Sequence, residues 1–127
     1  MHRSDTDNFD HEEEQNRNKE ARSQRIRELN DQFRRTGLGG RQFITPGIQE
    51  MGLLDVMTIR QLVASYDAFC EDNDPHGEHD FGNLTHRGQT IFWKIDYYDA
   101  TLTAGSPNPA DPAVTTRVLT ILLAQEY

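Results

Sequence analysis

The sequence lacks the features that direct a chain into or across a membrane. Its longest apolar stretches, such as residues 121–124, break off within a few positions, far short of a membrane span. The first 15 residues hold no apolar segment that a secretion machinery could recognise. Cys70 is the single cysteine and cannot form an internal disulfide. Because it lies late in an apolar helical stripe, we expect it to be a small buried hydrophobe. These absences predict a cytoplasmic protein without membrane contact.

Basic residues are also scarce. The chain has 13 Lys and Arg against 21 Asp and Glu, a formal net charge of −8, which opposes direct binding to nucleic acid. The charge is uneven, because residues 21–41 carry six Arg and residues 66–127 carry ten acids. Two interpretations remain open: ordinary solvated faces, or a basic helix and an acidic face that meet a protein partner.

Two common catalytic signatures are missing. Ser106 lies in a proline-rich turn without the G-x-S-x-G setting of a serine hydrolase. Gly37, Gly39 and Gly40 follow a predicted helix, whereas the glycines of a phosphate-binding loop precede one. Neither a serine hydrolase nor a nucleotide-binding protein is expected.

The composition divides the chain into a leader and one domain. Residues 1–22 hold one aromatic residue, Phe9, and no aliphatic residue larger than Ala after Met1. Such a segment cannot bury enough apolar surface to offset its ordering entropy. We therefore predict a disordered polar leader over 1–22 and a single domain over 23–127.

Periodicity predicts the elements of that domain. Ile26, Leu29 and Phe33 recur at helical spacing within a helix of about 24–36, and a short strand follows at 41–45. A second helix is predicted over 54–70, with Leu54, Met57, Leu62, Val63, Tyr66, Phe69 and Cys70 on its buried face. Strands at 80–85 and 90–98 form a hairpin, and Asp111 and Pro112 begin a final helix whose stripe is Val114, Val118, Ile121 and Leu122. The fold class is α+β, with a small antiparallel sheet of about three strands packed against two or three helices.

The strand at 90–98 has two distinct faces. Ile91, Trp93, Ile95 and Tyr97 alternate with Phe92, Lys94, Asp96 and Tyr98. The first set is expected in the core. If the second face is uncovered, its aromatic residues favour a homodimer or another partner.

One segment concentrates acids and histidines. The run DNDPHGEHD contains Asp72, Asp74, His76, Glu78, His79 and Asp80. Its spacing resembles a calcium loop, but Asn83 stands where a bidentate Glu is needed.

A zinc site is the other metal that this segment suggests. It would use His76 and His79 with Glu78 or Asp80, yet no second pair of ligands follows. Alternatively, these residues structure the loop by capping and by hydrogen bonds to the backbone. No metal and no other cofactor is expected.

Lys94 and Asp96 share one strand face and could approach Glu78 or Asp80. Such a grouping suggests a metal-dependent nuclease, although Lys94 precedes Asp96 where an acid usually comes first. The alternative is a network of side chains between Lys94, Asp96 and the preceding strand.

Four segments of the chain resemble a known family. IRELNDQFRRTGLGG, NDPHGEHDFG, IFWKIDYYD and SPNPADPAVTTRVLTILLAQEY are similar to blocks of a small proteobacterial domain-of-unknown-function family and cover about residues 26–127. The resemblance implies a bacterial source, because members of this family are often found in alphaproteobacterial genomes and on plasmids or other mobile elements. It assigns no catalytic residue.

Two functions follow as expectations. The first is a non-catalytic protein-interaction module, such as an accessory regulator or an inhibitor of a host defence complex, whose partner could handle nucleic acid. The second is a metal-assisted hydrolase or nuclease that uses the Asp72 to Asp80 loop. An enzyme needs these groups to converge in one pocket, whereas an interaction surface needs them exposed.

Overall fold

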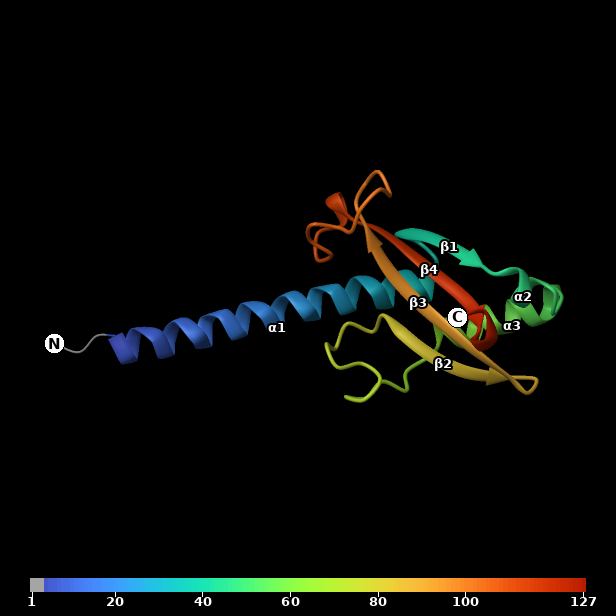
Figure 1. Cartoon of the computed structure of the whole chain (residues 1–127), viewed down its shortest axis with the longest axis horizontal. Helices are drawn as coiled ribbons and strands as arrows, with labels where there is room; N and C mark the ends of the chain where they lie inside the picture. The colour runs from blue at the N-terminus through green and yellow to red at the C-terminus, as the bar shows by residue number, and fades with distance from the viewer. Residues whose placement is uncertain (1–3) are drawn as a thin grey trace.

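The computed structural model describes residues 4–127, with side chains from Asp10 onward. Its helices are α1 (Ser4–Thr36), α2 (Pro46–Gln49) and α3 (Leu53–Ala64). The strands are β1 (Gly40–Ile44), β2 (Phe81–His86), β3 (Gln89–Tyr98) and β4 (Thr116–Leu123). Two short 3₁₀ turns, η1 (Pro112–Val114) and η2 (Ala124–Glu126), flank β4 (Figure 1).

The four strands form one sheet in the order β1-β4-β3-β2. β2 and β3 form the expected hairpin, β3 pairs antiparallel with β4, and β1 pairs parallel with β4. The predicted α+β class is therefore confirmed. The sheet has four strands where about three were expected, and it is mixed where an antiparallel sheet was expected.

The core lies between the helices and one face of this sheet, here called the inner face. As predicted, Ile91, Trp93 and Ile95 point into it, and Trp93 is completely buried. The helices contribute the apolar residues Phe33, Ile48, Ile59 and Val63, and β4 contributes Leu119, Ile121 and Leu123. The three α-helices therefore cover the inner face, and within residues 4–127 no α-helix lies on the other face.

Helix α1 extends far beyond the sheet (Figure 1). Its buried side chains begin at Ile26, and residues 10–22 are exposed. The sequence predicts disorder over 1–22, whereas the structure continues the helix back to Ser4, with the i,i+4 pair Glu13–Arg17 on its surface. Residues 1–3 of the predicted leader lie outside the described residues. None of the helices in the described part of the chain is long and apolar enough to cross a membrane.

The predicted final helix is wrong, because Thr116–Leu123 is strand β4. Asp111 does act as an N-cap, because its side chain accepts a hydrogen bond from Ala113 N at 2.9 Å. The helix that it caps is only the short 3₁₀ helix η1, which ends at Val114. The next residues are rich in β-branched side chains, which pack well on a pleated surface. The i, i+4, i+7, i+8 spacing of Val114, Val118, Ile121 and Leu122 therefore misled the helix prediction.

Helix α3 is shorter than predicted, because it ends at Ala64 and not at Cys70. The guanidinium of Arg34 on α1 donates to the carbonyl oxygens of Val63, Ala64 and Tyr66 at 2.7, 3.1 and 2.9 Å. These bonds satisfy carbonyls at and beyond the helix end, and they add to the backbone hydrogen bond that Val63 O accepts from Tyr66 N at 3.3 Å. Beyond this end Cys70 is exposed, so its predicted burial is wrong.

Candidate functional site

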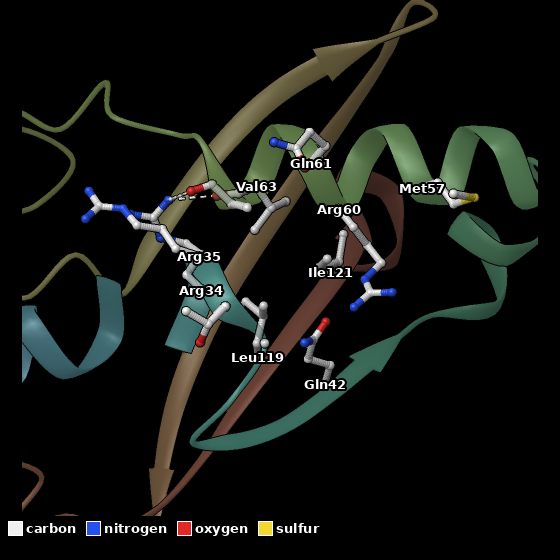
Figure 2. Close-up of a pocket in the computed structure, with 12 residues that line it drawn as sticks. Arg34, Arg35, Gln42, Met57, Arg60, Gln61, Val63, Leu119 and Ile121 are labelled. Atoms are coloured by element: carbon white, nitrogen blue, oxygen red, sulfur yellow. Dashed lines mark hydrogen bonds between the residues drawn. The ribbon is translucent and has the colours of Figure 1, made fainter. Parts of the chain in front are cut away.

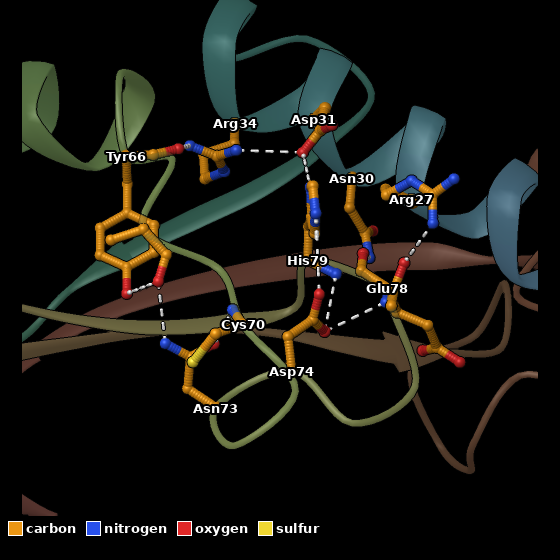
Figure 3. A network of polar contacts seen from close by, with 12 residues as sticks. Arg27, Asn30, Asp31, Arg34, Tyr66, Cys70, Asn73, Asp74, Glu78 and His79 are labelled. Atoms are coloured by element: carbon orange, nitrogen blue, oxygen red, sulfur yellow. Dashed lines mark hydrogen bonds and ion pairs between the residues drawn. The ribbon is translucent and has the colours of Figure 1, made fainter.

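The acid and histidine loop is built around the carboxylate of Asp74, which is 9% exposed. Its Oδ1 accepts hydrogen bonds from the backbone N–H groups of Glu78 and His79 at 3.1 and 3.2 Å (Figure 3). These bonds hold a tight turn in which His79 has a φ of 55°. Asp74 thus acts on the loop itself and points away from solvent.

His79 joins this loop to α1. Its Nδ1 lies 2.9 Å from Oδ1 of Asp31, and its Nε2 lies 3.6 Å from Oδ2 of Asp74 (Figure 3). The ring stacks on Phe69 with a centroid distance of 3.7 Å. Asp31 is also paired with Arg34 at 3.0 Å, so His79 takes part in the contacts that fix the ends of α1 and α3.

A buried polar network continues from the loop into the sheet, with Asn30 of α1 at its centre. Asn30 Nδ2 donates to the carbonyl of Glu78 at 3.0 Å and to Tyr97 Oη at 2.7 Å. Arg117 Nε donates to Asn30 Oδ1 at 2.7 Å, and Tyr97 Oη donates to Oε1 of Glu78 at 2.9 Å. Burial raises the pKa of Tyr97 well above its usual value, so the phenol stays protonated and serves as a donor.

The remaining loop residues do not converge on a common point. Asp72 and His76 are exposed, and His76 lines a shallow pocket together with Gln24 and Arg27 of α1. Burial, reinforced by the negative charge of Glu78, raises the pKa of Asp80. Among the side chains of residues 10–127, no three His, Cys, Asp or Glu are grouped as metal ligands, so His76, His79 and Glu78 do not assemble the zinc site considered above.

Lys94 and Asp96 lie apart from this loop. Their side chains pair with each other at 3.3 Å on the face of β3 opposite the core, here called the outer face. Glu78 instead accepts a hydrogen bond from Tyr97, which lies on the inner face of β3. The structure therefore does not bring Lys94 and Asp96 together with Glu78.

The surface that sequence reasoning missed is on α3. Leu53, Leu54 and Met57 are 74%, 79% and 57% exposed, although Leu54 and Met57 were predicted to be buried. Leu62, also predicted to be buried, is 38% exposed. The helix faces the core through Ile59 and Val63 instead. We call Leu53, Leu54 and Met57 the α3 surface.

A cavity of about 240 Å³ opens beside the α3 surface, between α1, α3 and β1. Arg60 and Gln42 point toward each other across it, and Met57 lies at one end (Figure 2). Its charged lining residues are Arg34, Arg35 and Arg60, and no acid lines it. Within the described residues neither Arg35 nor Arg60 has a carboxylate oxygen within 4.0 Å, since the ion pairs there involve other cations.

A sequence signal for the α3 surface does exist. The helix is apolar on more than one side: Ile59 and Val63 form one stripe at i,i+4, while Leu53, Leu54 and Met57 form another at i,i+3 and i,i+4. A helix that is apolar all round is either deeply buried or covered on two sides. This short domain offers only one side for burial.

Comparison with known proteins supplies a family and no activity. No curated protein and no solved structure matches the chain. A family model described as a protein of unknown function (DUF3768) matches residues 44–126, from the last residue of β1 to η2. The resemblance to a family of unknown function is thus confirmed over a shorter range than 26–127, with α1 outside it. The chain belongs to the DUF3768 family of proteins of unknown function.

Proposed function

We propose that this chain is a non-catalytic, cytoplasmic protein-interaction module that binds a protein partner through the α3 surface. The observation that supports this proposal is the exposure of Leu53, Leu54 and Met57 on one short helix. Large apolar side chains grouped on a surface mark interaction sites, because water solvates them poorly.

The cavity beside this surface favours a particular partner chemistry. An apolar segment on the α3 surface would place its neighbouring residues near Arg60 and Arg35, which pair with no carboxylate among the described side chains of residues 10–127. Acidic residues in the partner would supply that charge. The expected partner segment therefore combines apolar and acidic side chains.

Within this class, the specific role we propose is an accessory regulator or an inhibitor of a host defence complex, encoded by a mobile element. The ten acids of residues 66–127, none of which lines the cavity beside the α3 surface, support it, since an acidic surface is complementary to the basic channels of complexes that handle nucleic acid. The alternative of a metal-assisted hydrolase or nuclease has less support, because Asp74, Glu78 and His79 are engaged in contacts within the fold.

The test compares three forms of the full chain as baits in lysate of the source organism. They are the wild type, a Leu53→Ser, Leu54→Ser, Met57→Ser variant, and a Leu38→Ser control at an equally exposed leucine outside α3. We expect a protein that is retained by the wild type and the control and is lost with the triple variant. Binding is then measured with that protein in purified form.

For the purified pair we expect the dissociation constant to rise at least about tenfold in the triple variant, as for the loss of a central apolar contact. Arg60→Glu alone should also weaken binding relative to the wild type, because it places a negative charge opposite the acidic residues expected in the partner. If every retained protein binds the triple variant as well as the wild type, the α3 surface is not a binding site and the proposal fails.

A further inference from the structure

The outer face of the sheet carries two exposed aromatic residues, Phe43 and Tyr98, whereas Phe81 and Phe92 on it are half-buried and Leu122 is buried. By the strand register it is formed by residues from all four strands: Arg41, Phe43, Phe81, Asn83, Phe92, Lys94, Asp96, Tyr98, Thr116, Val118, Thr120 and Leu122. Phe43 is 55% exposed and Tyr98 is also exposed, while Tyr127 packs edge-on against Phe92 at a centroid distance of 5.6 Å. A sheet face of this kind is a candidate for association with another surface.

The charged residues at the centre of this face, Lys94 and Asp96, are placed so that two copies of the face can be complementary. Lys94 and Asp96 flank Ile95 on β3, an inner strand of the sheet, and Ile95 itself points into the core. A two-fold axis that lies in the plane of contact, runs perpendicular to the strands and passes over Ile95 of β3 exchanges the levels of Lys94 and Asp96. Lys94 of each copy then faces Asp96 of the second copy.

The same rotation also matches the flanking rows. Phe43 is level with Thr120 and Lys94, whereas Arg41 is level with Val118 and Asp96. Phe43 of one copy therefore lies over Arg41 of the second copy, a pairing that permits a cation–π contact.

Further out along β3, the register also relates two aromatic residues to each other. Phe92 and Tyr98 are equally far from Ile95 in opposite directions and lie on the same face. The rotation thus brings Phe92, with Tyr127 packed against its ring, to the level of Tyr98 of the second copy. Two sheets packed face to face keep their strands within about 30° of each other, so the rows nearest the axis stay in register.

From these pairings we propose that two copies of this chain form a homodimer through the outer faces of their sheets. The face suits a second copy because its strands carry Arg41 and Lys94 against Asp96, without the acidic excess of the chain as a whole. It is self-complementary about one axis, which a two-fold interface requires. This inference does not depend on the α3 surface, which lies on the other side of the sheet.

Sedimentation of the full 14.6 kDa chain over a concentration series tests the proposal. We expect a species of twice this mass in the wild type. Lys94→Glu and Asp96→Lys should each weaken dimerisation at least about tenfold, because each variant places like charges opposite one another.

Mixing the two variants provides the decisive measurement. In a heterodimer, Glu at 94 meets Lys at 96 and the native Asp96 meets the native Lys94, so both contacts regain opposite charges. We expect the mixture to dimerise although neither variant does so alone. Fluorescence of Trp93 confirms that each variant is folded, since this residue is buried and is the single tryptophan.

Three outcomes would overturn the homodimer. They are a wild type that stays monomeric throughout, a dimer that both charge variants retain, and a mixture that fails to restore dimerisation. Arg60→Glu and the triple α3 variant serve as controls whose mass should equal that of the wild type. Loss of the dimer in the α3 variant alone would show a different interface, and loss of partner binding with an intact dimer would count only against the proposed function.

Discussion

Asn30 shows how one residue can join distant parts of a fold. It is completely buried, and its amide binds groups from the loop at Glu78, from β3 and from β4. The sequence gives no hint of this role, because Arg117 is 87 positions away and an asparagine within a helix is usually solvated.

We expect Asn30→Ala to lower the free energy of unfolding by about 2 kcal/mol, because it leaves the buried Arg117 Nε and the Glu78 carbonyl without a partner. Urea unfolding followed by Trp93 fluorescence measures this change. Gln32→Ala, at an exposed position two residues along the same helix, should have little effect. Equal effects of the two substitutions would contradict the central role of Asn30.

Asp80 gives a dependence of stability on pH. Its raised pKa means that the folded protein binds this proton more tightly than the unfolded chain does. The contribution of the group to stability is therefore full below the usual aspartate pKa and is lost as the pH rises through the raised value.

Asp80→Asn should accordingly raise the melting temperature by a few degrees at neutral pH, because it removes a charge that burial disfavours. The gain should vanish at about pH 3, where the carboxyl group of the wild type is protonated and therefore as neutral as the amide of the variant. Asp72→Asn, in the same loop but exposed, is the matched control. A lower melting temperature for Asp80→Asn at neutral pH would mean that the ionised carboxylate is needed by the fold.

At the scale of elements, local patterns predicted what depends on near neighbours. The hairpin of β2 and β3 was confirmed because strand alternation and the turn at Arg87 and Gly88 lie within one short stretch. The end of α3 was missed because Arg34, from another helix, satisfies its last carbonyls. Strand β4 was missed because its neighbours β1 and β3 determine its state, and its own spacing fits a helix as well.

Helix α1 yields a prediction of its own. Deleting residues 1–22 should leave the melting temperature nearly unchanged, because residues 10–22 are exposed. The helical signal in circular dichroism should fall, since this part of α1 contributes helix. Deleting through residue 29 also removes the buried Ile26 and should destabilise the domain. An unchanged helical signal after the first deletion would support the disorder that the composition predicts.

For the whole molecule, the two proposed surfaces lie on opposite sides of the sheet. A homodimer through the outer faces leaves each α3 surface pointing away from the contact. Such a dimer presents two binding sites to partners, and a partner with repeated subunits would bind it more tightly than it binds one copy.

The place of β4 between β1 and β3 also bears on the order in which the protein can be made. While the ribosome synthesises the chain, β1 has no strand beside it until Thr116–Leu123 has been added, and only the β2–β3 hairpin can form earlier. The apolar residues of the hairpin and helices therefore stay exposed until β4 has been added. Nascent chains of this protein should be clients of chaperones that shield such surfaces until the sheet closes.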